Sequence, residues 1–250
     1  MFNFFKNKKD AVKVKCYTTS RTGIHYAYPP QIVSQPSWAK KLKGASCLET
    51  ARSMVEKTEP HTFSTIQTCP GRFELYKKGF IIPLWSDLYI QVNEEGEWKY
   101  QFSDLESKIA EHPWPQYSSM CKEGEFSHLK LVSPWVLDSP EDVDFIAIKP
   151  AWEIKALHGL EILPGILNFY HQHSTNINLF IKNSKEKKQE FFLKAGTPLY
   201  HMIPLSDRKV ELEVKAVDSS DVDLINALKE PRLSFSSRNY RQHMKGKNKP

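Results

Sequence analysis

Two histidines that lie one residue apart, in the stretch "NFYHQHSTNINLF" at 168–180, have the spacing that most directly suggests chemistry. The stretch continues as an alternating apolar run, and residues two apart on a strand point to the same face. His171 and His173 would then converge as two ligands of a divalent transition metal, with His201 and Glu190 as further ligands from the returning segment. The alternative is that both histidines belong to a polar turn and form local hydrogen bonds.

The segments "HQH" and "AGTPLYH" are similar to the two metal-binding motifs of cupins, which are double-sheet jelly rolls. In that family the H-x-H pair is followed a few residues later by a glutamate. Here the first carboxylate after His173 is Glu186, thirteen residues further on. The resemblance implies a metal-dependent enzyme, but the expected carboxylate ligand is missing from its usual place.

The segment "LPGILNFY" at 163–170 resembles a motif of the β-clip nucleotidohydrolases, such as dUTPases. Its proline, glycine and tyrosine fit that motif, whereas Asn168 stands where the family has an aspartate at the catalytic site. Without this carboxylate, the water that such enzymes activate has no general base. The chain also has no P-loop, no G-x-G-x-x-G and no G-x-S-x-G nucleophile motif. These patterns favour a protein that is not an enzyme.

Three tryptophans beside prolines, in "PLWSD", "HPWPQ" and "SPWVL", are candidates for protein binding. Tryptophan is enriched at the energetic centres of protein interfaces, so we expect Trp85, Trp114 and Trp135 to contribute to one. The basic segment at 232–250 has six Lys and Arg residues and no acidic ones, and it supplies four more candidates: Arg238, Arg241, Lys245 and Lys247.

The net charge of +6 comes from the two ends of the chain. Residues 1–15 carry a net +4 and residues 232–250 a net +6, so the segment between them carries −4. Basic ends of this kind can dock on an acidic partner or stay solvated. Nucleic-acid binding is expected only through these ends.

The elements that must position these residues are mostly short strands. An alternating pattern predicts a first strand at 12–18 and a core strand at 177–182 that buries Ile177, Leu179 and Ile181. The remaining expected elements are a helix at 47–58, a turn at 69–71 ("CPG"), an antiparallel meander over 62–103 bent at Pro83, a surface loop at 111–126, strands within 128–137, 142–154 and 209–217, a hairpin turn at 184–189 and a helix at 219–231.

This spacing of strands and turns predicts a mainly β fold, a jelly roll or two-sheet β-sandwich with one or two short helices. We expect a basic tail at 1–11, one domain at 12–231 and a basic tail at 232–250. The four cysteines form no C-x-x-C pair and are expected to be reduced thiols. No apolar run approaches the roughly 20 residues that span a bilayer, and the N-terminus lacks the features of a signal peptide.

Four stretches taken together, "TCPGRFELYKKGFIIPLWSDLYI", "SPWVL", "PAWEI" and "FLKAGTPLYHMIPLSDRKVELEV", resemble a family of uncharacterised proteins of large contractile-tailed bacteriophages, especially marine ones. The resemblance covers about residues 12–217. It implies synthesis in the cytoplasm of a bacterial host and brings no established active site. The expected function is therefore non-enzymatic binding of other phage proteins or a host protein, as a virion or assembly component. A homo-oligomer is a possible state, and no membrane partner is expected. The alternatives are the metal-dependent enzyme described above and an inhibitor of a host protein.

Overall fold

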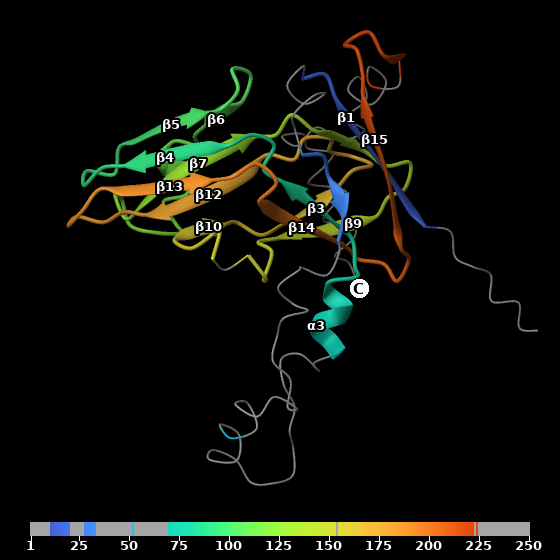
Figure 1. Cartoon of the computed structure of the whole chain (residues 1–250), viewed down its shortest axis with the longest axis horizontal. Helices are drawn as coiled ribbons and strands as arrows, with labels where there is room; N and C mark the ends of the chain where they lie inside the picture. Colours follow the sequence, from blue (N-terminus) through green and yellow to red (C-terminus); the bar gives the residue numbers. More distant parts are fainter. Residues whose placement is uncertain are drawn as a thin grey trace, which may run out of the picture. The chain divides into compact units, whose positions relative to one another are not determined.

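Short β-strands are the main regular elements of the residues described by the computed structural model, which are 11–20, 28–33, 52, 70–153, 155–222 and 224 (Figure 1). The expected mainly β fold is confirmed, since the strands form several antiparallel sheets. The chain divides into two compact units, residues 1–32 with 79–250 and residues 33–78. The single domain expected over 12–231 stays a prediction. None of the described helices is long and apolar enough to cross a membrane.

Two sheets of the larger unit lie one in front of the other (Figure 1). The β4 sheet has the order β13 (Gln189–Leu193), β4 (Leu88–Val92) and β5 (Trp98–Phe102). The β7 sheet has the order β10 (Leu160–Ile162), β12 (Ile177–Lys182), β7 (Phe126–Val132) and β6 (Lys108–Ala110). Alternate residues of both sheets belong to one buried apolar cluster, which includes Ile177, Leu179 and Ile181 as the sequence predicts.

Two further sheets extend the larger unit. The β14 sheet has the order β11 (Gly165–Asn168), β9 (Asp144–Ile148), β14 (Pro198–Pro204), β3 (Phe80–Pro83) and β2 (Gln31–Ile32). The β1 sheet has the order β15 (Val210–Ala216), β1 (Val12–Thr18) and β8 (Val136–Asp138). Strand β1 is the predicted first strand, and it pairs in parallel with β15 along its whole length.

The predicted bend at Pro83 is where the chain passes from one sheet to another. Pro83 ends β3 in the β14 sheet and faces Pro198 across the ladder, and β4 then continues in the β4 sheet. A proline has no N–H to donate, so it suits a position where a ladder is interrupted. The segments before β14 and after β3 stay paired across the bend, because Leu84 accepts a backbone hydrogen bond from Gly196 and donates one to Thr197.

Three expected connections are wrong. In the described part of the expected meander over 62–103, which begins at residue 70, only β4 and β5 form a hairpin, since β3 pairs with β2 and β14. The segment 184–189 is no hairpin turn, because it joins β12 of the β7 sheet to β13 of the β4 sheet. The expected turn at 69–71 contains the start of helix α3 (Pro70–Leu75) in the smaller unit. Proline is favoured at the first position of a helix, where no N–H is needed.

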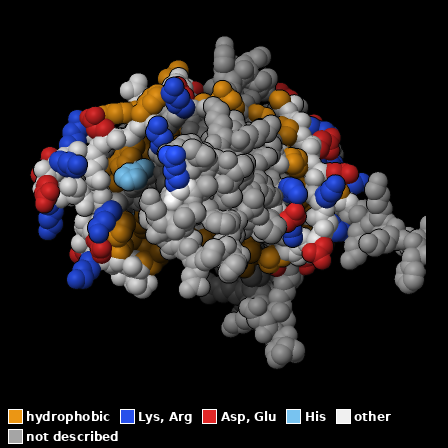
Figure 2. Space-filling model, turned by 60° about the horizontal axis from the view of Figure 1, so that its bottom comes forward, with side chains coloured by type: hydrophobic (Ala, Val, Ile, Leu, Met, Phe, Trp, Pro, Cys, Tyr) orange, Lys and Arg blue, Asp and Glu red, His pale blue; other side chains and the backbone are white. Residues whose placement is uncertain are grey.

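Several other predictions lie outside the described residues. They are the helix at 47–58, apart from Arg52, the first part of the meander, at 62–68, most of the helix at 219–231, and both tails except Ala11. The surface loop expected at 111–126 is confirmed up to the start of β7, and it contains the short 3₁₀ helix η3 (Trp114–Gln116). Figure 2 shows acidic and basic side chains interspersed with hydrophobic ones on one face of the described surface.

Candidate binding face

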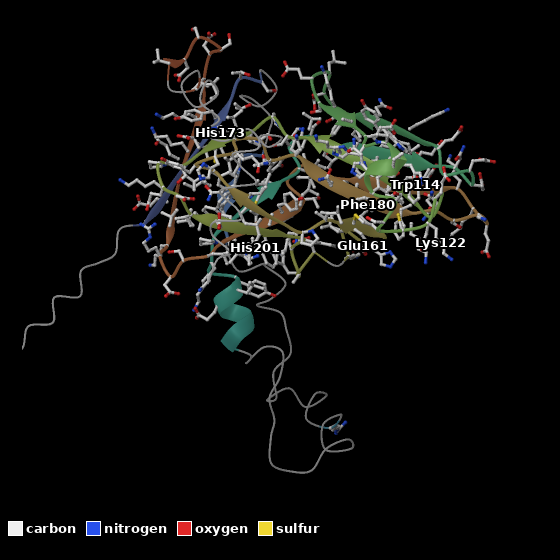
Figure 3. The ribbon with its side chains drawn as sticks, turned by 180° about the vertical axis from the view of Figure 1, so that it is seen from behind. Trp114, Lys122, Glu161, His173, Phe180 and His201 are labelled. Carbon is white, nitrogen blue, oxygen red and sulfur yellow. The ribbon has the colours of Figure 1, made fainter. Side chains whose placement is uncertain are left out.

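The four predicted metal ligands lie on different parts of the fold. His171 and His173 lie in the turn between β11 and β12, His201 lies on β14, and Glu190 lies on β13. Figure 3 shows His173 and His201 at separate places. Among the residues that the structure describes, no three or more His, Cys, Asp or Glu side chains are arranged to hold a metal ion. The structure therefore does not bring these four residues together.

The local partners of these residues suit a polar turn better than a metal site. The Nδ1 atom of His173 lies 2.9 Å from the carbonyl oxygen of Leu137 on β8. A carbonyl can only accept, so Nδ1 carries the proton and donates. The Nε2 atom of His171 lies 3.5 Å from a carboxylate oxygen of Asp142. The carboxylate of Glu190 lies 2.7 Å from the ammonium group of its neighbour Lys188.

Asn168, which stands at the position of the nucleotidohydrolase aspartate, has a structural role. Its amide nitrogen donates to carboxylate oxygens of Asp142 and Asp144, each at 2.6 Å. Its amide oxygen accepts from the backbone N–H of Tyr170 at 3.1 Å. Asn168 is buried, so its amide holds two carboxylates close together and fixes the turn that contains His171. A neutral donor is what this position requires.

Only one of the three predicted interface tryptophans offers ring surface to a partner. Trp85 is buried, and its indole N–H donates to Ser107 at 2.9 Å. Trp135 is also buried. Trp114 is half-buried at the start of η3 and packs edge-on against Tyr117 at 5.1 Å between ring centroids. The predicted residues Arg238, Arg241, Lys245 and Lys247 lie outside the described part of the chain.

The outer face of the β7 sheet carries an aromatic cluster. Along β7, Leu129 and Leu131 are buried in the core, so Phe126, His128 and Lys130 point to the opposite face. This alternation in "FSHLKLV" sets an aromatic ring, an imidazole and an ammonium group along one line.

Phe180 of β12 is the centre of this cluster. Its ring centroid lies 4.8 Å from that of His128 and 6.3 Å from that of Phe126. Tyr117, from the loop before β7, packs edge-on against Phe180 at 5.5 Å. Figure 3 shows Phe180 on the sheet with Trp114 nearby. Edge-on ring pairs of this kind add stability beyond the area that they bury, so the loop is fixed against the sheet.

The hydrogen bonds of His128 fix its neutral form. Its Nδ1 accepts from the backbone N–H of His112 at 3.0 Å, so the ring proton must be on Nε2. The Nε2 atom lies 3.2 Å from the amide oxygen of Asn178 and donates to it. Burial lowers the pKa of His128, and the positive charges of His112 and Lys130 lower it further, against the opposing effect of Asn178. His128 is therefore a neutral connector between loop and sheet.

The loop at 111–125 is also held by backbone hydrogen bonds. The N–H groups of Gln116 and Tyr117 close the 3₁₀ turn, and Met120 continues it. At the other end of the loop, Asn183 after β12 donates from its backbone to Glu125 and from its amide to the Gly124 carbonyl. The loop is anchored at both ends, so the side chains along it have a defined position.

A pocket of about 220 Å³ opens between this loop and the β4–β5 turn. Its lining includes four aromatic and three acidic residues and no Lys or Arg: Trp98, Trp114, Tyr117, Phe126, Glu95, Glu111 and Glu123. The rest of the lining is Gly96, Gly124, Ser127, His128 and Asn183. Burial, then the nearby Cys121 and Glu111, raise the pKa of Tyr117, so further negative charge is disfavoured here. We call this the aromatic–acidic pocket.

A second pocket, of about 550 Å³, is lined in part by His112 and Asn178, the two hydrogen-bond partners of His128. Its polar lining comes mainly from amide, hydroxyl and imidazole groups with one cation, and its residues are His112, Lys130, Ala147, Leu163, Pro164, Gly165, Ile166, Leu167, Gln172, Ser174, Asn176, Asn178 and Tyr200. The side-chain oxygen of Gln172 is buried there without a hydrogen-bond partner. Burial raises the pKa of Tyr200 to about 12, so its hydroxyl stays protonated and donates to the carbonyl of Leu163 at 3.0 Å.

Sequence reasoning missed the residues that form the aromatic–acidic pocket, apart from Trp114. The alternation around His128 contained a usable signal, because it places Phe126 and His128 on the face opposite to Leu129. No local signal could show that Trp98 faces the loop at 111–125, since the two segments meet only through the packing of the sheets. No protein-family model matches this chain, and no curated protein is similar enough to it to count as a relative.

Proposed function

We propose that the protein is a non-enzymatic bacteriophage protein that binds other proteins, as a virion or assembly component. The observation that carries the binding role is the aromatic–acidic pocket beside the loop at 111–125. Interfaces concentrate their binding energy in a few aromatic side chains that are held in place before the partner arrives. Trp114 has this character, because Tyr117 packs against its ring and the surrounding loop is anchored at both ends.

The size of the pocket supports a protein partner. Small-molecule sites usually enclose roughly 300–1,000 Å³, whereas this pocket encloses about 220 Å³. Such a volume suits one inserted side chain of a larger partner. Two exposed apolar side chains next to lining residues extend the available contact area: Tyr100 packs against Trp98, and Met120 follows Tyr117 in the loop.

The phage context, with synthesis in the cytoplasm of a bacterial host, rests on the sequence stretches alone. It belongs to the proposal because a phage product that binds neighbouring subunits would act in the assembly or in the particle. Another phage protein is the expected partner. A host protein as the partner would favour the alternative role of an inhibitor.

The test combines two measurements. Mass spectrometry of purified phage particles should detect the protein, and affinity capture from infected cells should recover a phage partner. Replacing Trp114 by alanine should reduce the capture at least about tenfold, which corresponds to about 1.4 kcal/mol of binding free energy. Phe192→Ala is the matched control, because Phe192 is an exposed aromatic ring on β13, away from the pocket. Absence from particles together with equal capture by both variants would reject the proposal.

The larger pocket supports a second candidate function, the binding of a small polar ligand. Its volume of about 550 Å³ lies within the range of ligand sites, and the unpartnered oxygen of Gln172 could accept a hydrogen bond from a ligand. Native mass spectrometry of the purified protein should then show a bound small molecule that Lys130→Gln releases. The cupin-like reading would need a metal, and elemental analysis with less than a tenth of an equivalent of Fe, Mn, Ni or Zn would end it.

A further inference from the structure

The aromatic–acidic pocket has the chemistry of a receptor for a single organic cation. Carboxylates of Glu95, Glu111 and Glu123 lie at its lining, and all three residues are exposed at the surface. No lysine or arginine belongs to the lining, so this negative charge has no counter-ion within the pocket. An ammonium or guanidinium group that entered would approach several carboxylates at once.

The aromatic walls favour the same ligand. Trp98, Trp114, Tyr117 and Phe126 come from three different parts of the chain and line one small space. A cation over an aromatic ring is attracted by the negative face of the ring, most strongly for tryptophan. Arginine and lysine also carry apolar stems that can lie along aromatic surfaces. The carboxylates thus suit the charged group of a Lys or Arg side chain, and the aromatic rings suit its apolar stem.

The chain itself contains a segment that could supply the cation for the aromatic–acidic pocket. Residues 232–250 carry six Lys and Arg residues and no acidic ones, whereas residues 16–231 carry a net charge of −4. This segment therefore offers several cations in succession, while residues 16–231 offer an excess of negative charge. Complementary charges of this kind steer association and select the partner.

We propose that the aromatic–acidic pocket binds a Lys or Arg side chain of the segment 232–250 of a second copy of this chain. The inference rests on the proposed function, since it names the partner as another subunit. Each copy carries both the pocket and the basic segment, so reciprocal exchange closes a dimer, and head-to-tail exchange gives larger assemblies. Because the contact is charged and lies at the surface, it weakens as salt increases.

The first measurement is the mass of the full chain in solution by light scattering after size-exclusion chromatography. We expect a dimer or larger assembly at low salt that dissociates at high salt. Replacing Arg238, Arg241, Lys245 and Lys247 by glutamine should give a monomer under both conditions. A full chain that stays monomeric at low salt would overturn the inference.

The second measurement uses a fluorescent synthetic peptide of residues 232–250 and its anisotropy on binding to the full chain. Glu111→Gln with Glu123→Gln should weaken binding about tenfold, and the variants should keep the circular dichroism spectrum of the wild type. The matched control removes the same charge outside the pocket, as Glu161→Gln with Glu186→Gln, and should leave the affinity within about twofold. Equal weakening by both double variants would show general charge attraction and overturn the inference. The proposed function would survive that result if Trp114→Ala still abolished capture of another phage protein.

Discussion

Replacing Asn168 by aspartate tests whether the buried amide holds two carboxylates together. The change keeps the shape of the side chain but removes the NH₂ group that donates to Asp142 and Asp144 at 2.6 Å. Hydrogen bonds to charged groups contribute about 1.5–3 kcal/mol each, so losing both costs about 3–6 kcal/mol before any relaxation. A third negative charge beside the other two adds repulsion. This loss is a large part of the roughly 5–15 kcal/mol by which domains are stable.

The loss should depend on pH in a defined direction. Three carboxylates in close contact raise the pKa of at least one of them above its unfolded value. The folded variant then binds more protons than the unfolded chain, so its stability falls as pH rises through the raised pKa and recovers as pH falls. The slope relative to the wild type can reach about 1.4 kcal/mol per pH unit for one proton.

Urea denaturation of both proteins between pH 5 and 7.5 measures this effect. Asn178→Asp is the matched control, because Asn178 accepts a hydrogen bond from His128 and lies opposite Lys130 on the neighbouring strand. The same chemical change should there cost less than about 1 kcal/mol, the usual size of a surface charge effect. If Asn168→Asp cost no more than this control at pH 7.5, or if its cost did not shrink at pH 5, the structural role assigned to Asn168 would be refuted.

Three further predictions concern the fold and its titrating groups. Gly79→Ala should cost about 1–3 kcal/mol more than Gly124→Ala in urea denaturation. Both glycines have a φ of +73°, but only at Gly79 would an added Cβ collide with backbone, namely the carbonyl oxygen of Met202 on β14. Equal costs would contradict the β3–β14 pairing. The wild type should lose stability as pH falls below about 6.5, because the lowered pKa of His128 makes protonation of the folded protein unfavourable. His128→Gln should reduce this loss of stability. His158→Gln, at an exposed position, should leave it unchanged. The buried thiol of Cys16, whose pKa burial raises, should stay unmodified by a thiol reagent until the protein is unfolded, and peptide mapping of the modified protein would reveal early labelling.

The fold class and the faces of the strands could be predicted because alternation reports which side of a strand is buried. Ile177, Leu179 and Ile181 are in the core for this reason. Strand partners could not be predicted in the same way, since a charged connecting segment has the same kind of sequence whether it joins two paired strands or strands of two different sheets. The segment 184–189 was expected to close a hairpin, but it carries the chain between sheets.

The candidate site shows the same limit. Trp85 and Trp114 have similar local sequences, with a proline close by. Trp85 is buried because Phe102 stacks on it and Ser107 accepts its N–H, and both partners lie about twenty residues away. Trp114 keeps an exposed side because it begins a short 3₁₀ turn above the sheet. Burial set by distant partners cannot be read from neighbouring residues.

The four predicted metal ligands are held apart for a related reason. Spacing placed His171 and His173 on one side of the chain, and both are indeed buried. Their partners, however, are set by tertiary packing: a backbone carbonyl for His173 and an aspartate for His171. Glu190 is held on another sheet beside Lys188. Spacing along the chain therefore could not show which side chains these histidines contact.

Site-specific photo-crosslinking tests the central claim, that the protein binds others through the aromatic–acidic pocket, most directly. A photo-reactive phenylalanine analogue would replace Trp114 in one variant and Phe192, the exposed ring on β13, in the other. In infected cells we expect a protein adduct from position 114 and none from position 192. An adduct with residues 232–250 of a second copy would support the inferred partner, and an adduct with another phage protein would support the binding role but contradict that partner. Adducts only from position 192, or none from 114, would contradict the central claim.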